Sequence, residues 1–367
     1  MSLKIAVAET EAEREACYRL RYDVNINAGK QGSFLCHHSR RVVDELDEIA
    51  TIYYAAEDDR IIATMRTVFG RDAVPDRYRD WFQTDLLHDI PRNELSFTSR
   101  LVICESHRNS MALRLLLGAN YYTGRRNGAL IDLMHCAPAL IPMYEKMGYQ
   151  CYARGIAHTD VGSHVPMLLL SDDAVRLKRL GSPFGFWAEE FPVSDARTAW
   201  FTRRFPEFAG GMSTSLSPVD GFIARIKAAL AADTGVGPAA SPADVAASRI
   251  GRELAAGLAS GERPFKRATR LLCRRGDIAA NSDEAFADLL IQISGSSTLV
   301  ANATSHRLNM TAHSGTTVID QFVDRPKHEQ LLLRCTADSE FLVIPGKELA
   351  RRKPQPAADG EESARAA

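Results

Sequence analysis

The 367-residue sequence predicts an α+β protein built from two folded units of different character. Three observations predict it. The first half alternates helix-like and strand-like segments, which is typical of a mixed sheet flanked by helices. An Ala-rich stretch follows, and the last third consists of short strand-like runs between Gly- and Asp-containing turns, as in an antiparallel β-roll or jelly roll. We therefore expect four parts: a mixed-sheet domain at 1–205, a helical connector at 206–262, a β-roll at 263–350 and a disordered tail at 351–367.

The elements of the first part follow from caps and turns. Thr10-Glu11-Ala12-Glu13 is a capping box, so we expect a helix from there to about Val24. Asp58-Asp59 is a turn signal, and Asn109 or Ser110 is the expected cap of a strongly apolar helix. The remaining expected strands are 49–56, 60–69, 97–104, 129–135, 149–158 and 165–170, and the remaining expected helices are 111–125 and 138–147.

The connector carries two helix-start signals. Ser217-Pro218 and Ser241-Pro242 each place a Ser cap before a Pro at the first helical position. They predict helices at about 218–231 and 242–258, joined by a Gly/Pro-containing stretch.

Composition excludes several classes of protein. The net charge of −1 gives no basic excess for nucleic acid, and no apolar run is long enough for a membrane span. The seven cysteines are dispersed and include no C-x-x-C pair, so we expect reduced thiols, no metal site and a cytoplasmic location. The first residues become acidic too soon for a signal peptide.

Several charged residues fall on or next to apolar segments of the first hundred residues. They are Arg21, Asp44, Asp47, Arg66 and, after Ser99, Arg100. Buried charges are costly unless they are paired. These residues therefore either form an internal ion-pair network or bind a charged substrate.

This pattern resembles the acyl-homoserine-lactone synthases and the related N-acyl amino acid synthases of the GNAT acyltransferase superfamily. The resemblance covers roughly the first half of the chain. It implies an N-acyltransferase domain at 1–205, with two central strands that part, that moves an acyl group from an acyl carrier protein or acyl-CoA thioester to the amino group of an amino acid or similar amine. It implies these substrate-binding residues: Arg21, Asp44, Asp47, Arg66, Ser99 and Arg100. The alternative is a catalytically inactive acyl-binding or sensor protein, in which the β-roll regulates or dimerises.

The same resemblance suggests catalytic residues. The segment 143–149 matches a superfamily element whose Tyr protonates the leaving thiolate, which makes Tyr144 the candidate general acid unless it only packs under the last strand. Phe97 stands where the synthases carry an acid, so Glu94 and His135 are the candidate bases. Asn25 replaces an aromatic residue of the synthases, and plain N-acylation is therefore expected rather than lactone formation.

The loop after the third expected strand is the candidate donor site. The superfamily pattern begins with Arg or Gln and needs Gly three residues later, whereas this chain has Arg108 followed by Met111. That departure favours an acyl carrier protein over acetyl-CoA. The candidate donor-binding residues are Cys104, Arg108, Asn109, Ser110, Met111 and Ala112. No cofactor is expected to stay bound, acyl-carrier-protein or acyl-CoA thioesters serve as co-substrates, and a second copy of the chain is the other expected partner.

The β-roll resembles cyclic-nucleotide-binding domains. When Gly315 is aligned with the leading Gly of the phosphate-binding cassette, Ile319 and Glu329 occupy positions that need Gly and Arg. A Glu in place of the Arg would repel a phosphate. We therefore expect that this domain does not bind a cyclic nucleotide and instead contacts the acyltransferase domain or a second copy of the chain.

Overall fold

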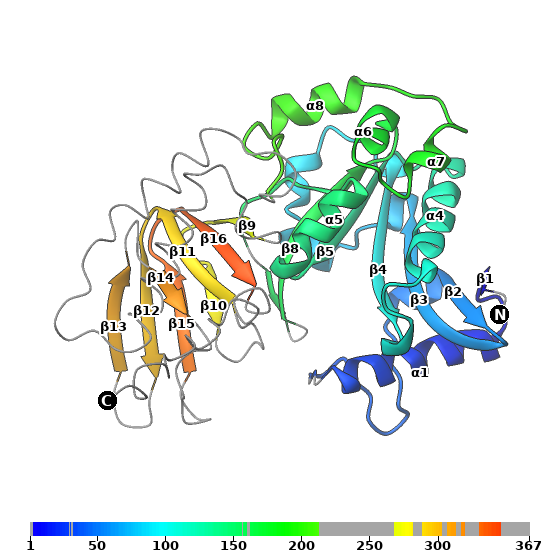
Figure 1. Ribbon diagram of the computed structural model, residues 1–367, viewed down its shortest axis with the longest axis horizontal. Coiled ribbons are helices and arrows are strands. Elements are labelled where there is room, and N and C mark those ends of the chain that lie inside the picture. The colour runs from blue at the N-terminus through cyan, green and yellow to red at the C-terminus, as the bar shows by residue number, and fades with distance from the viewer. Residues whose placement is uncertain are drawn as a thin grey trace, which may run out of the picture. The chain divides into compact units, whose positions relative to one another are not determined.

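The computed structural model describes residues 3–28, 30, 32–155, 157–159, 162–212, 268–281, 288–302, 307–312, 317–319 and 330–345. The chain divides into two compact units, Met1–Ser217 and Pro218–Ala367 (Figure 1). The two helices predicted for the connector and the tail at 351–367 lie outside the described residues, as do Gly315 and Glu329.

One eight-stranded mixed sheet organises the first unit, with strand order β1-β2-β3-β4-β5-β8-β6 and β7 paired to β8. Its pairs are antiparallel apart from the parallel pair of β4 and β5. The strands are β1 (Leu3–Val7), β2 (Thr51–Glu57), β3 (Arg60–Phe69), β4 (Leu95–Ile103), β5 (Ile131–Cys136), β6 (Gln150–Cys151), β7 (Ala157–Thr159) and β8 (Gly162–Leu170).

Two long helices and several short ones surround this sheet (Figure 1). The α-helices are α1 (Glu11–Asn27), α2 (Leu46–Ile49), α3 (Arg79–Phe82), α4 (Met111–Arg126), α5 (Ile141–Met147), α6 (Ala174–Arg179), α7 (Gly185–Ala188) and α8 (Ala196–Arg204). The 3₁₀ turns are η1 (Gly70–Asp72), η2 (Asp76–Tyr78), η3 (Thr84–Leu87), η4 (Arg92–Glu94), η5 (Glu105–His107) and η6 (Pro138–Leu140). No helix in the described part of the chain is long and apolar enough to cross a membrane.

The order of the predicted elements matches the structure, which adds the short helices α2, α3, α6, α7 and α8 and differs in two strands. The capping box is confirmed, because Thr10 Oγ1 accepts the Glu13 N–H and Glu13 accepts the Thr10 N–H at 2.9 Å. The short edge strand β1 was not predicted; it pairs with β2. The single strand expected at 149–158 is instead two short pieces, and Gly155 between them has a left-handed φ of 111° that interrupts an extended run.

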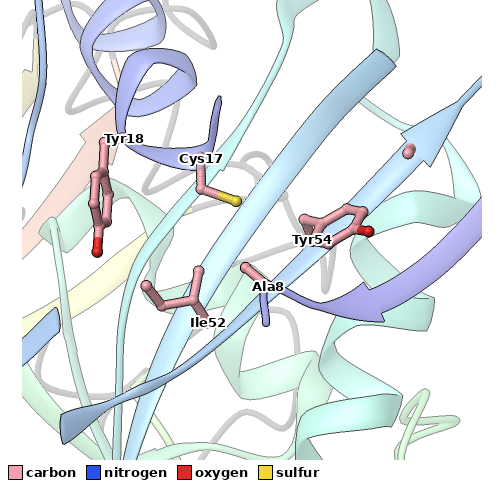
Figure 2. Close-up of a cluster of buried hydrophobic side chains, with 6 residues drawn as sticks. Ala8, Cys17, Tyr18, Ile52 and Tyr54 are labelled. Carbon is pink, nitrogen blue, oxygen red and sulfur yellow. The ribbon is translucent and has the colours of Figure 1, made fainter. Parts of the chain in front are cut away.

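The helices α1 and α4 cover opposite faces of the sheet. Cys17 and Tyr18 of α1 pack with Ala8 and with Ile52 and Tyr54 of β2 (Figure 2). On the other face, Asn120 of α4 donates to Thr98 Oγ1 of β4 at 2.9 Å. Because side chains alternate along a strand, each position of β2, β3 and β4 is assigned to the α1 face or the α4 face.

The central strands β4 and β5 pair over only part of their length. Their parallel register runs from Leu95↔Ile131 to Phe97↔Leu133 and then ends. β4 continues to Ile103, whereas β5 stays paired with β8 as far as Cys136. The two strands therefore part after Phe97, as the resemblance implied, and backbone groups of β4 beyond this residue have no ladder partner on β5.

The second unit contains two four-stranded antiparallel sheets, ordered β10-β15-β12-β13 and β14-β11-β16-β9. This architecture agrees with the predicted antiparallel β-roll; the likeness to cyclic-nucleotide-binding domains stays a prediction. The strands are β9 (Thr269–Cys273), β10 (Ile278–Asn281), β11 (Asp288–Ser294), β12 (Ser297–Asn302), β13 (Arg307–Ala312), β14 (Thr317–Ile319), β15 (Gln330–Cys335) and β16 (Ser339–Pro345).

A buried carboxyl joins the strands on the α4 face of the first unit. Asp132 accepts hydrogen bonds from Ser96 Oγ at 2.6 Å, Thr98 Oγ1 at 2.9 Å and the Tyr149 hydroxyl at 2.5 Å. Burial raises the pKa of Asp132, although these three hydroxyls favour its charged form. Asp132 therefore ties β4, β5 and the segment after α5 together where the sheet is still continuous.

We predict that Asp132→Ala destabilises the first unit by about 2–4 kcal/mol, because it leaves buried hydroxyls without an acceptor. Urea unfolding followed by tryptophan fluorescence measures this unit selectively, since all three tryptophans, Trp81, Trp187 and Trp200, belong to it. Asp85→Ala is the matched control, because that side chain is 88% exposed. Equal stability of the two variants would contradict the prediction.

Candidate active site

Arg66 lies at the centre of the candidate site, on the α1 face of the sheet. Its register partners are Ile52 on β2 and Ser99 on β4. Its Nε donates to Ser99 Oγ at 3.0 Å, and only 2% of its side chain is exposed. A buried guanidinium needs carboxylate partners, and the segment before β2, which includes α2, supplies them.

Asp44 and Asp47 are those partners, and their oxygens are taken up by the protein itself. Asp44 Oδ1 accepts from Arg66 Nη1 at 2.5 Å and from the Leu46 N–H, and its Oδ2 accepts from Arg66 Nη2 at 2.9 Å and Arg100 Nη2 at 2.7 Å. A carboxylate has about four acceptor sites, so Asp44 is saturated.

Asp47 is 1% exposed and nearly saturated as well. Its Oδ1 accepts from Arg21 Nη1 at 2.7 Å, and its Oδ2 accepts from the Asp44 N–H at 3.0 Å and contacts Arg66 Nη1 at 2.8 Å. Of the two interpretations left open by the sequence, these contacts favour the internal ion-pair network for both aspartates.

Arg21 joins helix α1 to this network. Its side chain is fully buried, and its guanidinium lies 5.3 Å from the centre of the Tyr18 ring. Its Nε and Nη2 atoms have no hydrogen-bond partner among the described residues. Burial lowers the pKa of Arg21, and the Asp47 carboxylate opposes that shift. Arg21 therefore depends on one carboxylate for its charge.

Arg100 reaches the same network through a β-bulge. The β3–β4 register shifts between Thr64↔Val102 and Arg66↔Ser99, which leaves one extra residue on β4. Arg100 takes the left-handed conformation there, with φ of 55°. Regular alternation would send Arg100 to the α4 face; the bulge instead aims it at Asp44. Its side chain is 23% exposed, so it is the arginine of this network that a solute can reach.

His135 lies beside the parted strands. Its ring packs near Phe97, Phe82 and Trp81, and its centre is 4.4 Å from that of His164. The pKa of His135 is lowered to about 4, chiefly by burial and to a smaller extent by the positive charges of Arg100, Arg66 and Lys30. The imidazole is therefore neutral near pH 7. Its buried Nδ1 atom has no hydrogen-bond partner among the described residues.

Tyr144 lies on the opposite side of the sheet from His135. Its ring meets Tyr149 edge to face at 5.8 Å, and Tyr149 is bonded to Asp132 on the α4 face. Burial raises the pKa of Tyr144 well above its usual range, so its hydroxyl keeps its proton. Burial likewise raises the pKa of the neighbouring Cys136 thiol, whose sulfur contacts Met167 Sδ at 3.4 Å. Cys136 is therefore no activated nucleophile.

Glu94 is not brought to the Arg66 network. It lies in η4, just before β4, and its carboxylate pairs with Arg197 of α8. Arg197 also pairs with Asp172 at 2.9 Å. Of the two candidate bases, His135 is the one electrostatically coupled to Arg100.

The candidate donor loop leads into helix α4. Ser110 is the N-cap, because its Oγ accepts the Ala112 N–H at 3.2 Å. Asn109 takes a left-handed φ of 68° immediately before it, and Met111 is 54% exposed. Arg108 contacts Glu105 at 3.8 Å, and Cys104 precedes η5. The loop thus exposes the first turn of a 16-residue helix, while the binding of a donor there stays a prediction.

Sequence reasoning missed the surroundings of His135. Trp81 and Phe82 come from a segment without strand or helix periodicity, and His164 belongs to β8. The one sequence signal for this aromatic environment was Phe97, an aromatic residue at a position where the resembled families carry an acid. In the described ranges, no group of three or more His, Cys, Asp or Glu residues could hold a metal ion.

Comparison with known proteins finds similarity only among solved structures. No protein-family model matches the chain, and no curated protein matches it. The CoA-dependent acyl-homoserine lactone synthase BjaI, solved with SAM and isopentyl-CoA, has a TM-score of 0.41 and 16% identity, covering 50% of this chain and 91% of that one. The acyl-homoserine lactone synthase LasI has a TM-score of 0.38 and 14% identity, covering 48% and 93%.

FeeM, an N-acyl amino acid synthase from uncultured soil microbes, has a TM-score of 0.37 and 12% identity, covering 46% of this chain and 92% of that one. Because these scores and identities are low, we base the function proposed below on the contacts of this chain's own residues.

We predict that Asp47→Ala destabilises the first unit by about 3–5 kcal/mol, because it leaves the fully buried Arg21 without its carboxylate. Tryptophan-monitored urea unfolding measures the change. Asp23→Ala is the control, since Asp23 is 51% exposed and pairs with Arg40 at the surface. A loss no larger than that of the control would show that the buried pair does not hold α1 to the sheet.

We also predict that His135 stays neutral down to about pH 4, where NMR of labelled histidine should place its titration. Arg100→Gln should raise the pKa of His135, because it removes a nearby positive charge, whereas Arg79→Gln, at a surface pair with Asp85, should leave it unchanged. Between pH 6.5 and about 4, the His135 side chain is protonated in the unfolded chain but neutral in the folded chain. His135 therefore lowers the free energy of unfolding as the pH falls toward 4. Titration of His135 at its ordinary pKa would contradict the prediction.

Proposed function

We propose that this protein is an N-acyltransferase that moves an acyl group from an acyl-carrier-protein or acyl-CoA thioester to the amino group of an amino acid or similar amine. One observation carries the proposal. Where β4 and β5 part, a bulge turns the partly exposed Arg100 toward the α1 face, close enough for its charge to act on the neutral, partly buried His135. A cation for a substrate carboxylate and a neutral base are thereby available at one opening of the sheet.

In this mechanism the amine nitrogen attacks the thioester carbonyl carbon directly, and the carbon–sulfur bond then breaks. His135 takes the proton that the nitrogen loses, and Tyr144 gives a proton to the departing thiolate. The backbone groups of β4 beyond Phe97, which have no ladder partner on β5, border the gap, and we propose that an N–H there donates to the carbonyl oxygen. The saturated Asp44 and Asp47 hold Arg66 and Arg100 in place instead of binding the amine.

The proposed binding site for the acyl donor consists of the first turn of α4 and the charged side chains near it. Ser106–Ser110 precede the helix, whose free N–H groups suit a single phosphate. Assays of thiol release with an acyl carrier protein thioester and with an acyl-CoA thioester distinguish the two donors. The alternative function, an acyl-binding sensor without turnover, is supported by Phe97 and Met111, which replace an acid and a Gly of the resembled families.

We predict that Arg100→Ala lowers kcat/KM for an amino acid acceptor by about 10- to 100-fold, mainly through KM, since one charged hydrogen bond is lost. The measurement is amine-dependent release of free thiol, with the N-acyl product identified by mass spectrometry. Arg79→Ala, a surface arginine that is 50% exposed, is the control. No thiol release with any amine, together with copurified acyl lipid, would favour the sensor instead.

A further inference from the structure

Three side chains near the C-terminal end of β4, here called the Ser106 triad, are joined by hydrogen bonds. Ser106 Oγ lies 2.8 Å from His107 Nδ1, and His107 Nε2 lies 3.0 Å from Glu57 Oε2. Ser106 is exposed, whereas the side chains of His107 and Glu57 are 23% and 30% exposed. A hydroxyl, an imidazole and a carboxylate linked in this order are the arrangement that activates a serine as a nucleophile.

The carboxylate of the triad decides which ring nitrogen of His107 carries the proton. A carboxylate only accepts hydrogen bonds, so the contact with Glu57 requires a hydrogen on Nε2. In the neutral imidazole Nδ1 is then the acceptor, and the Ser106 hydroxyl donates to it. His107 is therefore oriented to take the proton that Ser106 must lose when it attacks a substrate.

The backbone holds the triad at one corner of the sheet. Cys104 N–H donates to the Ile62 carbonyl of β3 at 2.8 Å, and His107 N–H donates to the Cys104 carbonyl at 3.0 Å. Glu57 ends β2, where it is in register with Arg60 at the start of β3. Both the turn that carries His107 and the strand that carries Glu57 are thus tied to β3, which fixes the imidazole relative to the carboxylate.

The triad also directly precedes the N-terminus of α4. Ser110 N–H donates to the His107 carbonyl at 3.2 Å, so one tight turn joins His107 to the N-cap of this helix. The first N–H groups of a helix have no helical acceptor, and their dipoles favour negative charge. Donors of this kind stabilise the oxyanion that forms when a hydroxyl adds to a carbonyl.

We propose that the Ser106 triad is a second catalytic centre, which hydrolyses carboxylic esters of small acyl groups. The side chains beside the serine are exposed and polar: Glu105, Arg108 and Asn109. Such a surface suits a short acyl group such as acetyl, because a long acyl chain needs an apolar lining. This activity goes beyond the proposed N-acyl transfer and uses none of its proposed acids and bases.

The proposed hydrolysis proceeds in two steps. Ser106 Oγ adds to the ester carbonyl carbon while His107 Nδ1 takes the hydroxyl proton, and the alkoxide leaves with that proton as an alcohol. Water then adds to the acyl-serine and gives a proton to His107; the carboxylic acid leaves, and Ser106 regains its proton. Glu57 does not touch the substrate: it is a positioning residue that holds the imidazole in one tautomer.

Covalent labelling of the full-length protein with diisopropyl fluorophosphate, read by peptide mass spectrometry, tests the nucleophile. We expect the adduct on Ser106, and we expect His107→Gln to form it about 100-fold more slowly. Hydrolysis of p-nitrophenyl acetate should fall by a similar factor in Ser106→Ala, whose exposed position tolerates the change.

Two exposed residues give matched controls for the labelling. Ser194→Ala and His88→Gln should leave both readouts unchanged, because Ser194 and His88 hydrogen-bond to backbone groups. The absence of an adduct on Ser106, or an adduct that forms equally fast in His107→Gln, would overturn the proposal. Labelling needs neither an amine nor a thioester, so its result is independent of the proposed N-acyl transfer.

The tautomer of His107 tests the role of Glu57. NMR of labelled histidine should show the hydrogen of the neutral His107 ring on Nε2. Glu57→Gln should lose this single tautomer and lower kcat for p-nitrophenyl acetate by about 10-fold with little change in KM, whereas Glu189→Gln, at a surface pair with Lys178, should change neither. Mixed tautomers in the unaltered protein, or an unchanged kcat in Glu57→Gln, would show that the three residues do not act as a triad.

Discussion

The carboxylate of Asp44 is the interaction on which the candidate site depends. It accepts hydrogen bonds from Arg66 of β3 and Arg100 of β4. The Asp44 N–H donates to Asp47, which in turn pairs with Arg21 of α1. Burying this many charges is costly unless every oxygen is used, and nearly every one is. The consequence is functional as well as structural. A carboxylate whose acceptor sites are already filled has none to offer an ammonium, so in the proposed reaction the recognition of the substrate would fall to the cations.

The position of Arg100 depends on two irregularities of the sheet, the β-bulge in β4 and the parting of β4 from β5. A left-handed arginine at a bulge costs about 1–3 kcal/mol, and the ion pair with Asp44 offsets that cost. The bulge lies next to the place where β4 leaves β5. Pairing on both sides of β4 would hold it straight. Losing the β5 ladder frees the strand to turn a side chain from one face to the other.

Many elements of the fold and the charged residues of the candidate site could be predicted from the sequence, because the patterns that indicate them are local. The capping box, the Ser110 cap, the hairpin and the charges on apolar segments all depend on residues close in the chain. The rest is set by distant partners. Ser96, Thr98 and Tyr149 look like ordinary strand residues until they meet Asp132. No Gly in the sequence indicates the bulge at Arg100. The aromatic residues that pack against His135 include Phe82, which comes from a segment without helix or strand periodicity.

The parted strands separate the two proton transfers of the proposed reaction. His135 and Arg100 belong to the α1 face, whereas Tyr144 is linked through Tyr149 to the Asp132 cluster on the α4 face. With the sheet between them, the two groups would act on a thioester in the gap from opposite faces. An amine that arrives on one face and a thiol that leaves on the other would then each find a group in the right protonation state, because burial keeps His135 neutral and Tyr144 protonated.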